Sequence, residues 1–428
     1  MSLVLAVDLG STSFKAALLD RRLRVVSEGR SLLTYRYGVG GQVTLDVRSV
    51  DAAMRTAIRG AVGDRGEQIQ AVALTSQAQT FTLLDPAGRA SCPFISWRDG
   101  RREAVQAAAT LNRKWPEFGQ QAGFGQLLPA LQVAQLAALR PSAAFRAVLL
   151  PSYLLWQLTG ALRVDENQAA MTGLYGLASQ AWISKALLAC GLTAAQLPEL
   201  IPLGDVAGAT TRAAIRFGLP AGIPVVLAGN DQTAGAYGAA IESKGGLLLT
   251  LGTAIAAYTC CDALPAPSAS CIRGPYPGGR YYRMTADGCG GGLINWAEQL
   301  LAGCSTDQAF FAEAARSPAG ANGLQFAAAP ERGGGDWLGG DPGHKPADFA
   351  RALLETLSRR AAACVGALEV VPPPAHLLAG GGAGQQKMLR DLVQQETGIR
   401  VMPTKATPLH GAARMAWQQA SGADMATA

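Results

Sequence analysis

Two aspartates follow short apolar runs, at points where strands would end. Asp8 comes after residues 3–7 and before a Gly-Ser-Thr-Ser turn, and Asp231 comes after residues 223–228 within Gly-Asn-Asp-Gln. A carboxylate beside a hydroxyl-rich turn can hold Mg²⁺, directly or through water, next to a phosphate. A carboxylate after a buried strand, at the mouth of a cleft, can take a proton from a hydroxyl that attacks phosphorus. Structural roles are open as well, because Asp8 could cap its turn and Asp231 a helix that starts at Thr233.

Glycine-rich turns at the ends of apolar runs are candidate phosphate sites. They lie at residues 8–13, 252–253, 288–292 and 380–384. Such turns expose several backbone N–H groups, which bind phosphate without help from side chains. The Walker A and GxGxxG patterns are both absent, so neither a P-loop nor a Rossmann site is indicated. Lys15, just behind the first turn, is either a phosphate contact or a solvated charge on a strand edge.

Aromatic and amide side chains form a third group of candidates. Residues 97–101, Trp-Arg-Asp-Gly-Arg, could stack on and hydrogen-bond a polyhydroxylated ligand, although an exposed loop leading into a helix has the same composition. Gln77 and Gln79 follow a predicted strand at residues 69–75, where amides could bond hydroxyls. The three histidines, at 344, 376 and 410, are assigned structural roles.

The elements that position these residues form a module that occurs twice. Residues 3–7 and 14–19 flank the first turn and predict a β-hairpin, with a third strand at 24–28. The pattern restarts at residues 246–259, where Leu-Gly-Thr answers the earlier Leu-Gly-Ser and an aspartate again follows ten residues after the glycine. A chain built from two related halves makes a cleft between them, and we place the boundary near residue 242.

Periodicity predicts the remaining elements. Helices are expected at residues 50–62, 129–140, 152–158, 233–240, 293–301, 347–369, 385–396 and 411–419. Further strands are expected at residues 81–84, 376–379 and 399–402. The Gly/Pro-rich stretch 330–346 is predicted to be a surface loop.

Composition limits the class of protein. The 428 residues are 49% hydrophobic and 16% charged, which excludes disorder over most of the chain. The net charge of +6 comes without any basic run, so nucleic acid is not expected as a partner. No apolar stretch is long enough for a transmembrane helix, and Asp8 interrupts what would be a signal-peptide core. The eight cysteines form no CxxC pair, and a cytoplasmic location is expected.

Taken together, the motifs resemble those of the FGGY carbohydrate kinases, in the actin-like ATPase superfamily, and most of all those of the xylulokinase subgroup. Residues 6–15 resemble the family's first phosphate motif, 82–85 with 95–101 its sugar-side segment, and 229–232 the segment with the catalytic base. Residues 251–253 resemble the second phosphate motif. Residues 378–383 and 411–413 resemble the adenosine segment and the closing helix.

The resemblance implies an α/β fold of two ribonuclease H-like, actin-like ATPase domains, residues 1–242 and 243–428, with a central nucleotide and sugar cleft. It implies an ATP-dependent kinase that phosphorylates a hydroxyl of a small sugar: a ketose such as a pentulose, a polyol or a sugar acid. Asp231 would be the general base and Asp8 would position Mg²⁺. The other matched positions are ATP contacts at Gly10, Ser11, Thr12, Ser13, Lys15, Gly252, Thr253, Gly291, Gly381, Gly382, Ala383 and Gln386, and acceptor contacts at Gln77, Gln79, Trp97, Asp231 and Gln232.

Departures from the family pattern bear on the acceptor. Glycerol kinases carry Arg-Glu, and xylulokinases Met-His, where this chain has Ala78-Gln79 after Gln77. The sequence therefore supports neither glycerol nor xylulose as the acceptor. Gln385 replaces the usual serine of the adenosine motif, and the acidic residue common before the closing Gly-Ala-Ala is missing. The chain is also short for the family, in the loop near 331–340 and after the closing helix.

Two alternatives to a sugar kinase stay open. One is a switching ATPase like actin or Hsp70, although such proteins lack the 97–101 segment. The other is a sugar-binding paralogue that has lost turnover, which the retention of Asp8, Asp231 and Thr253 disfavours. Dimers are common in the family, so a homodimer is compatible with the resemblance.

Overall fold

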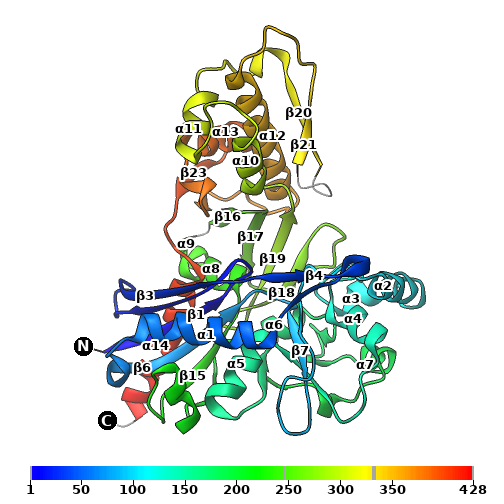
Figure 1. Ribbon diagram of the computed structural model, residues 1–428, viewed down its shortest axis with the longest axis vertical. Coiled ribbons are helices and arrows are strands. Elements are labelled where there is room, and N and C mark those ends of the chain that lie inside the picture. The colour runs from blue at the N-terminus through cyan, green and yellow to red at the C-terminus, as the bar shows by residue number, and fades with distance from the viewer. Residues whose placement is uncertain (1, 245, 330–333, 427–428) are drawn as a thin grey trace. The chain divides into compact units, whose positions relative to one another are not determined.

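The computed structural model describes residues 2–244, 246–329 and 334–426 (Figure 1). The chain forms two compact units. Unit 1 comprises Met1–Gly238, Asp262–Tyr281 and Ala406–Ala428, and unit 2 comprises Ala239–Cys261 and Tyr282–Lys405. The chain therefore leaves unit 1 close to the boundary predicted at residue 242, but it returns twice. The linear division into residues 1–242 and 243–428 stays a prediction.

Unit 1 is built on a six-stranded sheet in the order β14-β15-β6-β1-β2-β3. Its strands are β1 (Leu3–Leu9), β2 (Ser13–Leu19), β3 (Val25–Leu32), β6 (Ile69–Ser76), β14 (Val206–Ala209) and β15 (Pro224–Asn230). The predicted hairpin is confirmed, because β1 and β2 pair antiparallel, and β6 lies parallel to both β1 and β15. All seven residues of β1 are buried, so the strand that carries Asp8 is central.

Helices on unit 1 complete its core. Apolar residues at helical spacing give α1 (Val47–Val62) one buried face, which packs on β2 and β3. The helix α14 (Pro408–Ala426) packs on β1, β6 and α8 (Asp231–Gly238). A second sheet has the order β4-β5-β8-β7-β9, made of Tyr35–Tyr37, Val43–Leu45, Phe94–Ile95, Phe81–Leu84 and Arg146–Leu149. The other helices of at least five residues in unit 1 are α2 (Arg102–Lys114), α4 (Gln132–Leu139), α5 (Leu150–Thr159), α6 (Glu166–Ala170) and α7 (Ser184–Cys190).

Unit 2 repeats the same strand plan. Five strands run in the order β19-β17-β16-β22-β23, made of Arg280–Asp287, Ile255–Cys261, Leu247–Leu251, His376–Gly380 and Arg400–Pro403. As in unit 1, a hairpin (β16 and β17) is followed by a strand parallel to its first member, and another strand is parallel to that. The order matches β3-β2-β1-β6-β15, which confirms that one module is used twice. The helices are α10 (Gly291–Glu298), α11 (Asp307–Ala314), α12 (Pro346–Gly366) and α13 (Lys387–Thr397), with the short α9 (Ile241–Lys244).

The prediction of a surface loop at residues 330–346 is wrong for the middle of that stretch. Gly334–Leu338 forms β21, which pairs antiparallel with β20 (Gln325–Ala329). The ring of Trp337 stacks on that of Trp296, with centroids 5.3 Å apart, and this contact fixes a strand that glycine content disfavours. Residues 330–333, where the loop shortened relative to the family begins, lie outside the described residues.

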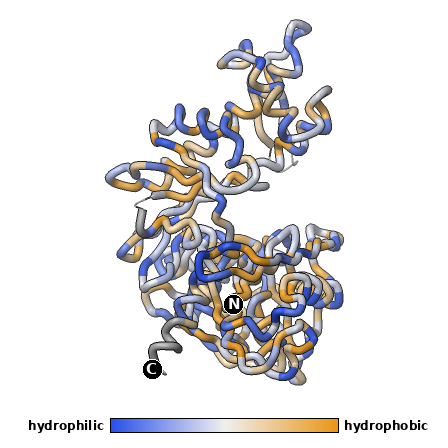
Figure 2. The backbone as a smooth tube through the Cα atoms, turned by 90° about the vertical axis from the view of Figure 1, so that its left-hand side faces the viewer, coloured by the Kyte–Doolittle hydropathy of each residue, from blue (hydrophilic) through white to orange (hydrophobic). Residues whose placement is uncertain are grey.

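Apolar and polar residues are interspersed along the tube in both units (Figure 2). Within the described part of the chain, no helix has both the length and the apolar run needed to cross a membrane.

Candidate active site

Asp8 lies at the turn end of β1, in the centre of the unit 1 sheet. It is paired across β2 with Lys15 and across β6 with Thr75, and its side chain is 5% exposed. Gly10 brings the turn close to the carboxylate, because a Cβ at Gly10 would lie 3.6 Å from both Asp8 oxygens. Asp8 Oδ1 is buried and has no hydrogen-bond donor among the described residues. Asp8 does not cap its turn, so the structural alternative for this residue is not supported.

The turn after β1 is tied down through its carbonyl groups. Gln77 Nε2 donates to Gly10 O (3.5 Å), the Tyr35 hydroxyl to Ser11 O (2.7 Å) and the Leu33 N–H to Thr12 O (3.1 Å). The N–H groups of Ser11 and Thr12 have no partner among the described residues. Fixed carbonyls with unused N–H groups are what a backbone phosphate site requires. Ser13, in contrast, is 2% exposed, and its hydroxyl accepts from Arg30 Nε.

The electrostatics of Asp8 suit a cation ligand. Burial raises the pKa of Asp8 most, the charge of Asp231 raises it further and Lys15 opposes them, with a result of about 7. A buried carboxylate with an unpaired oxygen is stabilised by a bound cation, and Mg²⁺ typically takes one or two carboxylates and completes its shell with water and phosphate. The described residues contain no cluster of three His, Cys, Asp or Glu side chains that could hold a metal ion. Asp8 therefore has the chemistry to hold Mg²⁺.

Asp231 is the first residue of α8, directly after β15. The helix begins two residues earlier than predicted, and Asn230, not Asp231, acts as its cap: Asn230 Oδ1 accepts from Thr233 N (2.9 Å). Asp231 is partly exposed, and its Oδ1 accepts from Gln232 N (2.9 Å). Loss of surrounding water raises the pKa of Asp231 to about 6, against hydrogen bonds and Lys15, which lower it. A carboxylate with that pKa is ionised at neutral pH and basic enough to accept a proton.

Lys15 links the two aspartates electrostatically. It is exposed, lies opposite Asp8 on β2, and lowers the pKa of both Asp8 and Asp231. The structure therefore brings Asp231 of α8 together in unit 1 with Asp8 and Lys15 of the β1–β2 hairpin, from which it is distant in sequence. Gln232 follows Asp231 in α8 and is partly exposed.

The acceptor candidates lie after β6 and β8. Gln77 is 4% exposed, and its Oε1 is buried without a donor among the described residues. Gln79 has φ of 69°, a left-handed conformation that a non-glycine residue adopts at some cost and that often marks a functional loop. Trp97 is 38% exposed, and its backbone N–H donates to Thr80 Oγ1 (3.2 Å). Gln77 thus offers a buried acceptor, and Trp97 an exposed indole.

The rest of the 97–101 segment is structural except for Arg98. Burial raises the pKa of Asp99, but its bidentate pair with Arg101 and the Val43 N–H outweigh this and lower it. The Arg98 guanidinium lies over the rings of Trp97 (5.3 Å) and Tyr35 (5.0 Å). Asp99 and Arg101 therefore hold the loop that presents Trp97.

In unit 2, three glycine turns pack against one another. The Gly291 N–H donates to Gly252 O (2.6 Å), and a Cβ on Gly381, which has φ of 80°, would lie 2.5 Å from Leu251 O. Ala383 approaches the same point, 3.8 Å from a Cβ at Gly291. Thr253 and Gly382 are exposed beside them, and Gln386 precedes α13. The ATP-contact candidates of unit 2 thus form a single cluster.

Comparisons with known proteins identify the family of this chain. The family model "FGGY family of carbohydrate kinases, N-terminal domain" matches residues 3–238, which is more than half of the chain. This chain belongs to the FGGY family of carbohydrate kinases. It is therefore a phosphotransferase of the sugar-kinase class, in a family that uses ATP.

Individual relatives agree with this assignment. Xylulose kinase of Escherichia coli is 27% identical, over 96% of this chain and 89% of the relative. A glycerol kinase of Agrobacterium fabrum is 28% identical over 58% of this chain and 52% of the relative. The solved structure of ligand-bound xylulose kinase from Lactobacillus acidophilus matches with a TM-score of 0.88 at 22% identity, covering 99% of this chain and 90% of that one. The two-domain, actin-like ATPase fold is thereby confirmed.

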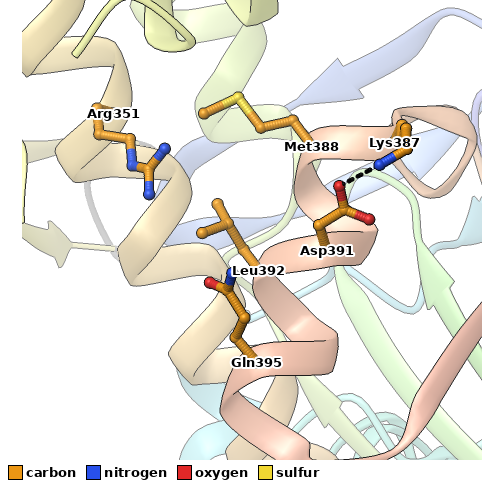
Figure 3. Close-up of a pocket in the computed structure, with 6 residues that line it drawn as sticks. All are labelled: Arg351, Lys387, Met388, Asp391, Leu392 and Gln395. Atoms are coloured by element: carbon orange, nitrogen blue, oxygen red, sulfur yellow. Dashed lines mark hydrogen bonds and ion pairs between the residues drawn. The ribbon is translucent and has the colours of Figure 1, made fainter. Parts of the chain in front are cut away.

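A surface cavity of this FGGY kinase begins next to the predicted ATP contact Gln386 but is lined by none of the predicted site residues. It measures about 420 Å³, lies between α12 and α13, and is lined by Arg351, Lys387, Met388, Asp391, Leu392 and Gln395 (Figure 3). Its charged groups are already paired, Lys387 with Asp391 (2.6 Å) and Arg351 with Glu355 (2.6 Å). None of the predicted ATP contacts lines it, so the cavity is not the nucleotide site indicated by the sequence.

Sequence reasoning missed two sets of residues around the site. Tyr35 gave no signal, because it is one of several aromatics in a polar stretch, yet its hydroxyl holds the phosphate turn. The buried residues Asp165, Asn167 and Gln168 contact the strand end that carries Asp231. Their polar Asp-Glu-Asn-Gln sequence is typical of an exposed helix start, so only burial distinguishes them.

Proposed function

We propose that this protein transfers the γ-phosphate of ATP to a hydroxyl of a small sugar, with Asp231 as the general base. The observation that carries the proposal is the place of Asp231 at the end of β15. There its carboxylate has a pKa raised to about 6 and lies within the electrostatic reach of Lys15 and Asp8. Membership of a family of carbohydrate kinases supports the reaction class, and the position and raised pKa of Asp231 support the choice of this residue as the base.

In the proposed reaction, the Asp231 carboxylate takes the proton of the acceptor hydroxyl as its oxygen bonds to the γ-phosphorus. The bond between that phosphorus and the β–γ bridging oxygen breaks, and ADP leaves. The free N–H groups of Ser11 and Thr12, together with Lys15, bind phosphate oxygens from unit 1. The Gly252, Gly291 and Gly381 turns provide nucleotide contacts from unit 2. Asp8 holds Mg²⁺, which neutralises phosphate charge when bound.

The acceptor is proposed as a class: a ketose such as a pentulose, a polyol or a sugar acid. The Gln77 Oε1 accepts a hydrogen bond from an acceptor hydroxyl, and the exposed Trp97 indole stacks on a sugar face. Gln79 and Gln232 offer further amide contacts. Ala78 and Gln79 replace the charged or histidine residues that glycerol and xylulose acceptors would meet, so neither compound is singled out.

The test is an ADP-release screen against ketoses, polyols and sugar acids, with Asp231→Asn beside the wild type. We expect sugar-dependent turnover in the wild type, and a loss of about 10²–10⁴-fold in the variant, because a missing general base costs that much. The variant is expected to bind ATP with unchanged affinity by calorimetry. Equal turnover in the two proteins would refute the base assignment, and ADP release that ignores every sugar would favour a switching ATPase.

A further inference from the structure

A buried polar helix start lies against the strand end that carries Asp231. The residues are Asp165, which precedes α6, and Asn167 and Gln168 in its first turn; their side chains are 1%, 0% and 0% exposed. Buried amides and carboxylates are costly unless they are hydrogen-bonded, so their partners indicate what they hold. Of these side chains, Gln168 leaves its Oε1 without a partner among the described residues.

Asn167 connects the residues on both sides of Asp231. Its Oδ1 accepts from Asn230 N and from Asn230 Nδ2, each at 2.9 Å. Its Nδ2 donates to Thr233 Oγ1 (2.9 Å) and to Pro275 O (2.7 Å). A side-chain amide has two donor hydrogens and an oxygen that accepts twice, so Asn167 uses its full capacity.

The peptide before Asn230 is held from the same helix start. Gln168 Nε2 donates to Gly229 O (3.2 Å) and Ser76 O (3.2 Å), and Thr75 Oγ1 also donates to Gly229 O (2.8 Å). The Asp165 carboxylate accepts from Gln168 N (2.8 Å). Burial raises the pKa of Asp165 to about 6, against backbone hydrogen bonds that include one from Gly229. Both ends of the Gly229 residue are therefore fixed by α6 and β6.

The chain needs this support because it leaves regular strand geometry here. Gly229 has φ of 70°, and a Cβ on it would lie 2.9 Å from Asn167 Oδ1, so only glycine fits beside the amide. The parallel pairing of β15 with β6 also shifts register between Leu227 and Asn230. Strained backbone of this kind persists only where surrounding groups hold it, and such positions cluster at active sites.

Asp231 itself has little else to orient it. Among the described residues, its carboxylate accepts only from the N–H of the adjacent Gln232 and from its own backbone. Its direction is therefore set by the backbone of residues 229–233, which Asn167 and Gln168 hold. A displacement of about 1 Å at a reacting group can cost about 10²-fold in rate.

We propose that Asn167 is a positioning residue for phosphoryl transfer, which holds the 229–233 backbone so that Asp231 reaches the acceptor hydroxyl. This inference rests on the proposed role of Asp231 as the base. Asn167 acts through Asp231 and has no direct part in binding ATP or sugar. Gln168 and Thr75 assist by fixing the Gly229 carbonyl.

The test compares Asn167→Ala, Asp231→Asn and the double variant in the full-length protein, with steady-state kinetics on an acceptor found in the screen. In Asn167→Ala we expect kcat to fall about 10–100-fold, with KM for ATP and acceptor within about threefold of wild type. In the Asp231→Asn background, the Asn167→Ala substitution is expected to cause no further loss of kcat, because the base that Asn167 positions is already absent.

Asn112→Ala is the matched control. Asn112 lies in α2 and exchanges two hydrogen bonds with the Leu127 backbone, both at 2.9 Å, away from the residues assigned to the site. It should lower the unfolding temperature and leave kcat within twofold of wild type. Thr75→Val is the gentler variant: it removes one hydroxyl from Gly229 O without a change of shape, and we expect a 3–10-fold loss of kcat.

The outcomes separate the two proposals. Wild-type kcat in folded Asn167→Ala, or an equal loss with and without Asp231, would overturn the positioning role while leaving Asp231 as the base. If Asn167→Ala does not fold, a wild-type kcat in Thr75→Val would overturn the positioning role. Full turnover in Asp231→Asn alone would refute the base assignment itself.

Discussion

At the scale of single residues, the buried carboxylate of Asp8 works against the stability of the fold. Asp8 has one oxygen without a donor among the described residues, and its pKa is raised to about 7, mainly by burial. A carboxyl group whose pKa is higher in the folded state than in the unfolded chain destabilises the fold once it ionises. In the proposed role of Asp8, a bound cation would remove that cost, which would couple metal binding to stability at this residue.

We predict that Asp8→Asn raises the unfolding temperature at pH 8 by a few degrees, measured by calorimetry without Mg²⁺. Below pH 3.8 Asp8 is protonated in both the folded and unfolded states and contributes nothing. Between pH 3.8 and about 7 the folded state keeps a proton that the unfolded state loses, so stability falls with rising pH. The advantage of the variant should therefore shrink from pH 8 to pH 4. A variant that is less stable than wild type at pH 8 would contradict the account.

At the scale of elements, each candidate site is a set of turns held by neighbouring turns. In unit 2 the turns at Gly252, Gly291 and Gly381 lie close together: a Cβ at Gly291 would lie 2.9 Å from Gly252 O, and a Cβ at Gly381 would lie 2.5 Å from Leu251 O. In unit 1 Gln77, Tyr35 and Leu33 donate hydrogen bonds to the carbonyl groups of the first turn, and the N–H groups of Ser11 and Thr12 have no partner among the described residues. Glycine is required at Gly381 by both contact and backbone angle, and at Gly291 by contact.

We predict that Gly381→Ala lowers the unfolding temperature and weakens ATP binding at least tenfold. The added methyl group would lie 2.5 Å from Leu251 O, at a φ of 80° that alanine disfavours. The control is Gly366→Ala, at the exposed end of α12 where a Cβ meets nothing within 4 Å. It should bind ATP normally. Unchanged affinity in Gly381→Ala, measured by calorimetry, would count against the turn as a nucleotide contact.

At the scale of the whole molecule, the chain interleaves its two units. It crosses between them four times, and its last helix returns to unit 1. In α14, Ala412, Ala413 and Ala416 are fully buried, and Trp417 Nε1 donates to Asp20 O (3.0 Å). Unit 1 therefore depends on residues at both ends of the sequence.

We predict that a fragment of residues 1–242 does not fold by itself. It lacks α14, which covers β1 and β6, and also the segment 262–281, whose Arg273 donates to the backbone carbonyls of Gly119 and Gln120. The fragment should show no cooperative thermal transition in circular dichroism, while the full chain does. A soluble fragment with a sharp transition would support the linear division at 242.

The sequence predicted the repeated hairpin because apolar runs around a Gly-Ser or Gly-Thr turn allow few other structures. It also indicated Asp8 and Asp231, since each follows an apolar run within a turn that resembles a motif of the FGGY kinases. It did not reveal that α14 returns to unit 1, because such long-range packing leaves no local pattern. The β21 strand was missed since glycine content hides a strand fixed by Trp337. Asn167 was missed because a buried amide and an exposed one look alike in sequence.

The pH dependence of kcat/KM tests the base assignment most directly, at saturating Mg²⁺ so that Asp8 stays ionised. The general base must be unprotonated, and the pKa of Asp231 is raised to about 6. We predict that the rate rises tenfold per pH unit below about 6 and levels off above it, and that Asp231→Asn abolishes this limb. A wild-type profile that stays flat down to pH 4.5, or a limb retained in Asp231→Asn, would contradict the role of Asp231 as the base.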